Sequence, residues 1–197
     1  MRRSMWGFVV AVGMMVTLVA CASAPKAEID GAKASVDQAV AAGAGEYAGD
    51  ALKAAQDANA ALDAEVKAQE GKWFASYTKA AELASAAKAA GEKAVADAAA
   101  GKVKARDEAT AAIADAKTVL GEAQALLDKA PKGKGTAADI EAMKTDLVNA
   151  TTAITEAEAS LTGERFLDAK AKAESAKTAA TTVKTAVEAA MAAKGKK

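Results

Sequence analysis

The sequence of 197 residues contains no histidine, one cysteine and two prolines, and aromatic residues make up only 4% of it. A chain without imidazole or a second thiol can form neither an internal disulfide nor an ordinary zinc site. We also expect no other metal and no cofactor. The formal net charge is +0, with 26 basic and 26 acidic residues. Nucleic-acid-binding proteins carry a basic surplus, so we expect no nucleic-acid partner either.

Alanine dominates what remains. Hydrophobic residues make up 52% of the sequence, and much of that share is alanine. Alanine has the highest helix propensity of all residues, but its side chain buries little apolar area. We therefore predict an all-α fold with thin cores. Its form is expected to be an elongated helical bundle, or antiparallel helical hairpins that pack like coiled coils.

The N-terminus combines a basic start with an apolar run. Arg2 and Arg3 precede an apolar segment at residues 6–20, and Cys21 follows it directly. The segment has about 15 residues, fewer than the roughly 20 that a membrane-spanning helix needs. This pattern is typical of a bacterial lipoprotein signal peptide. We expect residues 1–20 to be cleaved and Cys21 to carry the lipid; a buried structural thiol is the alternative for Cys21.

Residues 21–26 then form the acylated anchor and a short linker. The residue after Cys21 is Ala22. In lipoproteins of Gram-negative bacteria, an aspartate at this position tends to retain the protein in the inner membrane. The resemblance to those proteins therefore implies a lipid anchor in the outer membrane, with the protein facing the periplasm.

Apolar residues at helical spacing predict six helices, divided by glycines and by a linker at residues 131–135. The third helix is expected to begin near Lys72 and to end before Gly101. In the fifth, residues such as Ile154 recur at intervals of three and four, which predicts a seam against another helix. In the second, Asn59 falls within the apolar stripe, where it either fixes the register between helices or turns to solvent.

Two sets of residues recur along the chain. In one set the residues lie 92 positions apart: Gly71, Phe74, Glu82, Ala84, Ala87, Ala94 and Val95 recur as Gly163, Phe166, Glu174, Ala176, Ala179, Ala186 and Val187. In the other they lie 84 positions apart: Ile29, Ala32, Lys33 and Ala39 recur as Ile113, Ala116, Lys117 and Ala123. Alanine also matches alanine by chance in such a chain. The matches predict two repeats of about three helices, at residues 27–100 and 101–193, followed by a basic tail at residues 194–197.

Several short segments carry a family resemblance. They are Cys21 to Pro25, Ala41 to Ala48, Leu52 with Ala55, and Tyr77 to Ala84, with Tyr47 and Tyr77 as the distinctive points. They resemble small alanine-rich bacterial lipoproteins grouped as domain of unknown function 4398, over roughly residues 21–98. Family members often have proline soon after the first tyrosine, where this chain has Ala48 and Gly49. The resemblance implies a helical module that faces the periplasm and has no known reaction.

Catalytic motifs are incomplete. The pairs Ser76 with Lys79 and Ser85 with Lys88 have the Ser-x-x-Lys spacing of penicillin-binding proteins. The Ser-Asp-Asn and Lys-Thr-Gly motifs that complete such a site are missing from the sequence. We therefore expect no enzyme and no catalytic residues.

Aromatic residues cluster at Trp73, Phe74 and Tyr77. They either fill the wide end of an alanine-thin core or form an exposed patch for a partner, another envelope protein or peptidoglycan. We expect a structural or protein-interaction module of the cell envelope, attached to the membrane through lipid on Cys21. The alternative is a tether that binds peptidoglycan through this cluster or through the tail, since Lys197 resembles the terminal lysine of the murein lipoprotein.

Overall fold

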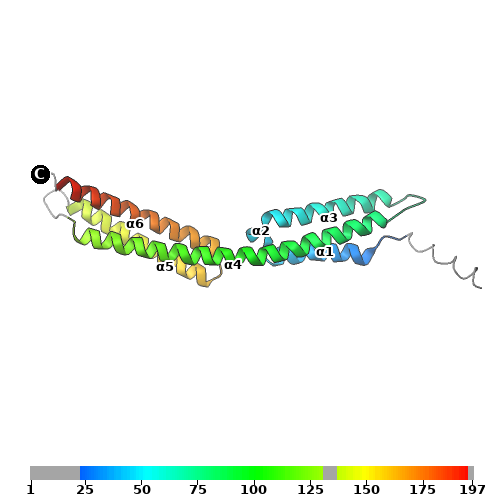
Figure 1. The fold of residues 1–197 in the computed structure, drawn as a ribbon, viewed down its shortest axis with the longest axis horizontal. Helices are drawn as coiled ribbons and strands as arrows, with labels where there is room; N and C mark the ends of the chain where they lie inside the picture. The colour runs from blue at the N-terminus through cyan, green and yellow to red at the C-terminus, as the bar shows by residue number, and fades with distance from the viewer. Residues whose placement is uncertain (1–22, 131–136, 195–197) are drawn as a thin grey trace, which may run out of the picture. The chain divides into compact units, whose positions relative to one another are not determined.

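The computed structural model describes residues 23–130 and 137–194, and the predicted all-α helical bundle is confirmed. Six α-helices account for all regular secondary structure in these residues (Figure 1). The predicted signal peptide and Cys21, the linker at residues 131–135 and the last three residues of the tail lie outside the described residues.

The chain divides into two compact units, with the division between Ala99 and Ala100. Unit 1 contains α1 (Lys26–Ala41), α2 (Ala44–Tyr47), α3 (Gly49–Gln69) and the first part of α4 (Thr78–Asp128). Unit 2 contains the rest of α4, α5 (Ala137–Thr162) and α6 (Phe166–Lys194).

The predicted break at Gly101 is wrong, because α4 continues through this residue without interruption. A single glycine inside a helix costs about 1 kcal/mol relative to alanine, which a long run of alanine and lysine neighbours offsets. One helix of 51 residues therefore supplies the third helix of unit 1 and the first helix of unit 2.

Unit 1 buries a narrow core between α1, α3 and α4. One cluster contains Ile29 of α1, Leu62 of α3 and Ala84 of α4, and the next contains Ala39, Ala55 and Ala94 of the same helices. Residue numbers increase from the first cluster to the second along α1 and α4 and decrease along α3. The first and third helices of the unit are therefore parallel, and α3 runs antiparallel to both (Figure 1).

The α1–α3 connection contains an extra helical turn that the sequence analysis did not predict. Gly43 has a left-handed backbone, with φ +82°, and ends α1 just before the four-residue α2. Glycine tolerates this conformation at little cost because it has no Cβ. The turn buries Ala44 completely against the core.

Helices α1 and α4 approach closely around Gly91. A Cβ added to Gly91 would lie 2.7 Å from the Cβ of Ser35 and 2.8 Å from its carbonyl carbon. The buried Ser35 hydroxyl donates a hydrogen bond to the Ala32 carbonyl in its own helix, at 2.7 Å. Glycine is therefore required at position 91 by a packing contact.

Asn59 takes part in a contact between α3 and α1. Its Nδ2 donates hydrogen bonds to the carbonyls of Ala32 and Ala55, both at 3.3 Å. Its Oδ1 is buried and accepts no hydrogen bond. Of the two predicted roles for Asn59, the contact between helices is the one that forms, and it leaves one polar atom unsatisfied.

Unit 2 packs in the same order with larger side chains. One cluster joins Ile113 of α4, Ile154 of α5 and Ala173 of α6, and a second joins Leu127, Leu147 and Val183 of these helices. The predicted seam of α5 is confirmed, because Ile154 is buried and packs against both neighbouring helices.

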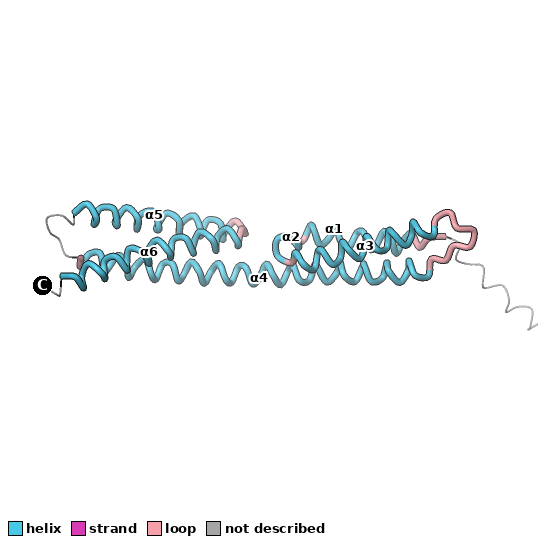
Figure 2. Tube along the Cα trace, turned by 90° about the horizontal axis from the view of Figure 1, so that it is seen from above, coloured by secondary structure: helices cyan, strands magenta, loops and turns pink. Residues whose placement is uncertain are grey.

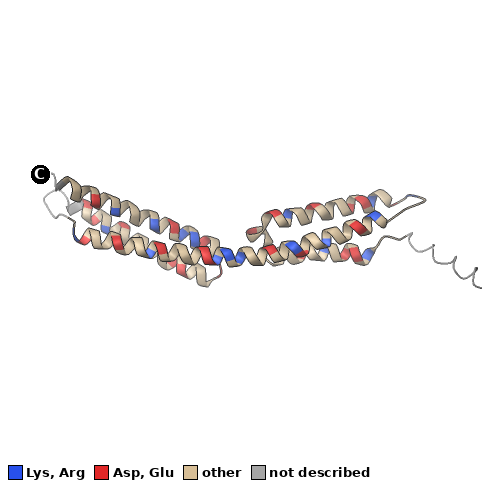
Figure 3. Cartoon of the chain, viewed as in Figure 1, with Lys and Arg blue, Asp and Glu red and all other residues tan. Residues whose placement is uncertain are grey.

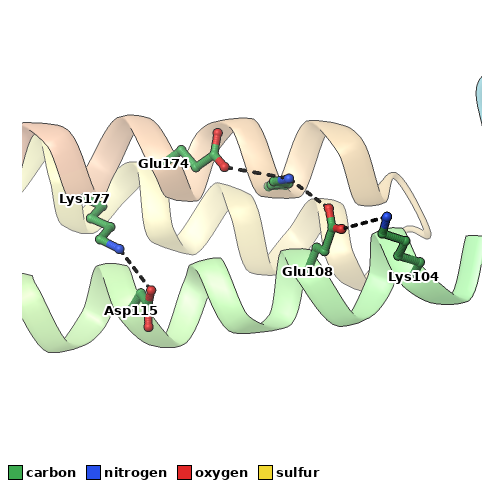
Figure 4. A network of polar contacts seen from close by, with 6 residues as sticks. Lys104, Glu108, Asp115, Glu174 and Lys177 are labelled. Carbon is green, nitrogen blue, oxygen red and sulfur yellow. Dashed lines mark hydrogen bonds and ion pairs between the residues drawn. The ribbon is translucent and has the colours of Figure 1, made fainter. Parts of the chain in front are cut away.

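Three ion pairs link the parallel helices α4 and α6 on the surface of unit 2, and Figure 4 shows the pair of Asp115 and Lys177. They join Glu108 to Lys170 at 2.8 Å, Asp115 to Lys177 at 2.9 Å and Glu122 to Lys184 at 2.7 Å. The spacing of seven residues along each helix is that of a coiled coil, in which equivalent surface positions recur every two turns. We call these pairs the ion ladder.

Candidate interaction surface at the aromatic loop

An exposed pair of aromatic side chains lies between α3 and α4. The connection at residues 70–77, called the aromatic loop here, leaves Trp73 91% exposed and Phe74 87% exposed. The interpretation that these two residues fill the core is therefore wrong. Tyr77 is half-buried and packs against the core cluster of Ile29 and Leu62.

The expected start of the third helix near Lys72 is also wrong, because α4 begins at Thr78. In sequence, Trp73 and Tyr77 extend the stripe of buried alanines at the start of α4 backwards by about two helical turns. Helix α3 ends at Gln69, and Gly71 follows with a left-handed backbone, φ +81°. The stripe continues in sequence, but α4 does not extend back to Trp73.

The side chain of Gln69 holds the two ends of the loop together. Its Oε1 accepts a hydrogen bond from the backbone N–H of Ser76 at 3.3 Å and another from Lys72 Nζ at 3.5 Å. Its Nε2 donates to Glu65 Oε1 at 2.7 Å. Gln69 is not among the residues predicted from the sequence. It is the last residue of α3, two residues before Gly71, and this position at a helix end is the signal for such a capping role.

Glu65 links the loop's support to α4. Its Oε2 lies 2.9 Å from Lys79 Nζ. The hydrogen bond from Gln69 and the contact with Lys79 hold the pKa of Glu65 below its ordinary value of 4.5. The carboxylate is therefore ionised at neutral pH, and it forms an ion pair with the lysine of the Ser76–Lys79 motif.

The aromatic loop lies at the end of unit 1 where α1 begins. Figure 2 shows the loop in pink beside the start of α1, and Figure 1 places the two side by side as well. The packing agrees, because Ala24, just before α1, and Tyr77, at the end of the loop, both pack against the same core cluster. The loop and the chain that leads back to Cys21 thus share one end of the unit.

Unit 2 makes the corresponding connection with a short turn. Residues 163–165 join α5 to α6, and Glu164 has a left-handed backbone, φ 58°. The buried Ser160 hydroxyl donates a hydrogen bond of 2.7 Å to Asp168, which lowers the pKa of this carboxyl. Three residues therefore suffice for this connection, and packing of three helices does not require the aromatic loop.

The second Ser-x-x-Lys pair lies on the surface of unit 1. Ser85 and Lys88 are both exposed, and they line a shallow groove between α1 and α4 beside Gly31. In the described residues, no group of three or more acidic, cysteine or histidine side chains is placed to hold a metal ion. Acidic and basic residues mix along every long helix (Figure 3).

None of the helices described between residues 23 and 194 combines the length and apolar character needed to cross a bilayer.

Comparisons of the chain with protein-family models, curated proteins and solved structures give no match. Membership of the family that the sequence resembles therefore stays a prediction.

Proposed function

We propose that this protein is a lipoprotein anchored in the outer membrane by lipid on Cys21, where it faces the periplasm as a structural or protein-interaction module of the cell envelope. The observation that carries the proposal is the N-terminal pattern of two arginines, an apolar run and a single cysteine. Helix α1 begins at Lys26, five residues after Cys21.

The two units suit a structural or binding role. Each presents long helices with mixed charge, and α5 and α6 have 26 and 29 residues, which corresponds to roughly 39 and 44 Å of helix at 1.5 Å per residue. Such helices offer extended faces for other proteins. The most exposed large apolar side chains among the described residues, Trp73 and Phe74, lie together in the aromatic loop.

The first test replaces the acylated residue. Cys21→Ser removes the thiol to which lipid is attached, so we expect the protein to move from the membrane fraction to the soluble periplasmic fraction. Ser23→Ala is the matched control and should stay in the membrane. Mass spectrometry of the N-terminal peptide should show acyl chains on the wild-type protein. An unmodified thiol on a membrane-bound wild-type protein would refute the proposal.

The second test concerns which membrane holds the protein. We expect Ala22→Asp to shift the protein from the outer-membrane to the inner-membrane fraction on a density gradient, while Ala24→Asp should leave it in place. Inner-membrane location of the wild-type protein would contradict the outer-membrane assignment.

The alternative of a peptidoglycan tether remains a second prediction. The last residues of the tail lie outside the described residues. Co-sedimentation of the purified protein with washed sacculi tests it directly.

A further inference from the structure

The exposed aromatic residues lie at the end of unit 1 to which the chain from the expected lipid anchor leads. Cys21 is two residues before Ser23, the first described residue, and two extended residues span at most about 7 Å. Ala24 packs against the same core cluster as Tyr77 at the end of the aromatic loop. A lipid on Cys21 would therefore hold this end of unit 1 against the bilayer.

We propose that the aromatic loop is a second membrane contact, in which Trp73 and Phe74 insert into the headgroup region of the leaflet that holds the lipid of Cys21. This inference rests on the proposed function, because the lipid brings the loop to the membrane. The loop then restrains how unit 1 is oriented on the bilayer, while the acyl chains supply attachment.

The side chains in the loop fit a membrane interface. Trp and Phe each bury roughly 150–250 Å² when they are covered, and tryptophan favours the interface because its ring is apolar and its N–H is polar. Two such adjacent side chains at 91% and 87% exposure leave a large apolar area in water.

Charge plays a minor part in this contact. Within the loop, Lys72 and Glu70 have opposite charge, and nearby Lys79 is paired with Glu65. Attraction to anionic lipids needs a cluster of unpaired basic residues, which this arrangement does not offer. The contact is therefore apolar, and we expect it to persist at high salt, where ionic attraction to lipid is screened.

A bilayer is a better occupant than a separate protein because the tether ensures proximity. A group linked to a surface by a few residues meets that surface at a high effective concentration, without any additional partner. The short turn at residues 163–165 in unit 2 shows that the fold itself needs no such loop.

The fluorescence of Trp73 reports on the position of this side chain. The sequence has two tryptophans, and the other, Trp6, lies in the predicted signal peptide. The acylated mature protein, purified from membranes, is reconstituted into vesicles of phosphatidylethanolamine and phosphatidylglycerol with or without brominated lipid. We expect a blue-shifted Trp73 emission, quenching by brominated lipid, and an acrylamide quenching constant several-fold lower than that of the soluble Cys21→Ser variant. These results should persist at high salt.

The matched control moves the tryptophan to the other end of α1. In Trp73→Phe with Val40→Trp, the new tryptophan replaces a side chain that is 54% exposed. It lies fourteen residues along α1 from Lys26, or about 21 Å at 1.5 Å per residue. We expect this tryptophan to remain accessible to acrylamide and to be unaffected by brominated lipid.

The outcomes separate the inference from the proposed function. If the protein is acylated and bound to vesicles but Trp73 stays accessible to acrylamide, the second contact does not exist, although the lipoprotein assignment stands. Protection of Trp73 from both quenchers means that protein, such as a second copy of the chain, covers the loop, which also overturns the inference. If the mature protein carries no lipid and does not bind vesicles, the proposed function fails, and the inference that rests on it fails as well.

Discussion

Units 1 and 2 arrange three helices in the same order but hold them together differently. Among the described residues, the large side chains buried in unit 1 are Ile29 and Leu62. Unit 2 buries more of them: Ile113, Leu127, Leu147, Ile154, Phe166, Val183 and Val187. Each such side chain contributes about 1.5–3 kcal/mol when it is fully buried. We therefore expect unit 2 to be the more stable of the two.

The parallel helices show the same contrast. In unit 1, Gly91 lets α4 approach the backbone of Ser35 in α1. In unit 2, Val183 and Val187 of α6 pack between the helices, and the ion ladder spans the outside. The sequence offset of 84 places Gly31 of unit 1 at the position of Asp115, so unit 1 has no carboxylate there. Two helices can thus be joined by close backbone approach or by larger side chains with surface charge.

The largest expected effect comes from a charge in the core of unit 2. Ile154→Asp removes a side chain that is 4% exposed and replaces it with an unpaired carboxylate. Loss of a buried isoleucine alone costs about 2–5 kcal/mol, and burial of a charge adds to it. We expect native-state hydrogen exchange to show lost protection in unit 2, with far smaller changes in residues 26–90.

Val148→Asp on the same helix is the control. Val148 is 63% exposed, so we expect a change within about 0.5 kcal/mol. An equal loss of stability from the two substitutions would contradict the assignment of Ile154 to the seam.

The next effect tests the close approach in unit 1. Gly91→Ala places a methyl group 2.8 Å from the carbonyl carbon of Ser35, and we expect a loss of about 1–3 kcal/mol through overpacking. Gly121→Ala, in the part of α4 that belongs to unit 2, meets no atom within 4 Å. We expect it to stabilise the helix by about 0.5–1 kcal/mol. Thermal unfolding by circular dichroism measures both, and a stabilising Gly91→Ala would contradict the packing described here.

Asn59 provides a smaller test, of the stability that unit 1 loses by burying an unsatisfied oxygen at its α1–α3 contact. Asn59→Leu removes the buried Oδ1 that accepts no hydrogen bond and adds apolar area. The Ala32 carbonyl still accepts the hydrogen bond from Ser35. We expect stabilisation by about 1 kcal/mol in urea unfolding, since an unsatisfied polar group is costly to bury. A loss of similar size would mean that the hydrogen bonds of Asn59 outweigh its orphan oxygen.

The ion ladder should produce the smallest effect, because its members are exposed or half-buried at the surface, where water screens the charges. The hydrogen bond with Lys170 holds the pKa of Glu108 below 4.5 and raises the pKa of Lys170 above 10.5. This ion pair stabilises the fold at pH values between the pKa of Glu108 and the pKa of Lys170. Its contribution is lost as pH falls through the lowered pKa of Glu108, and also as pH rises through the raised pKa of Lys170.

We expect hydrogen exchange, corrected for the intrinsic rate at each pH, to show weaker protection along the α4–α6 face of unit 2 at pH 3 than at pH 7. The variant Glu108→Gln should show less of this pH dependence. Glu141→Gln, whose described ion pair is with Lys144 in its own helix, serves as the control. An unchanged pH dependence in Glu108→Gln would exclude the Glu108–Lys170 pair as its cause.

Comparison of the units also corrects the predicted internal register. The sequence matched Phe74 to Phe166 at an offset of 92, but Phe74 is exposed and Phe166 is buried. At an offset of 89, Tyr77 takes the place of Phe166, and Ala80 and Ala84 take the places of Ala169 and Ala173, which are also buried. Sequence identity favoured the wrong phenylalanine, because identity does not reveal which position faces a neighbouring helix.

Sequence reasoning located most of the core. The seam residue Ile154 is buried as predicted, because apolar residues at helical spacing have few alternatives to burial. At the end of α6 the same reasoning from sequence is not sufficient: the spacing of the buried Val183 and Val187 continues to Ala190, which is exposed. Of the candidate site, the sequence located the aromatic cluster but left open whether it was core or surface.

The amino-acid sequence by itself determined the helical character of the chain, the faces that its helices bury and the lipoprotein-like N-terminal pattern, because these depend on local propensity and spacing. Tertiary structure decided that α4 continues through Gly101, that Gly91 must lack a side chain and that Trp73 lies outside the core. Each of these depends on where a neighbouring helix lies or ends. A stripe shows which face of a helix can be buried, but only the packed neighbours determine how far that burial extends.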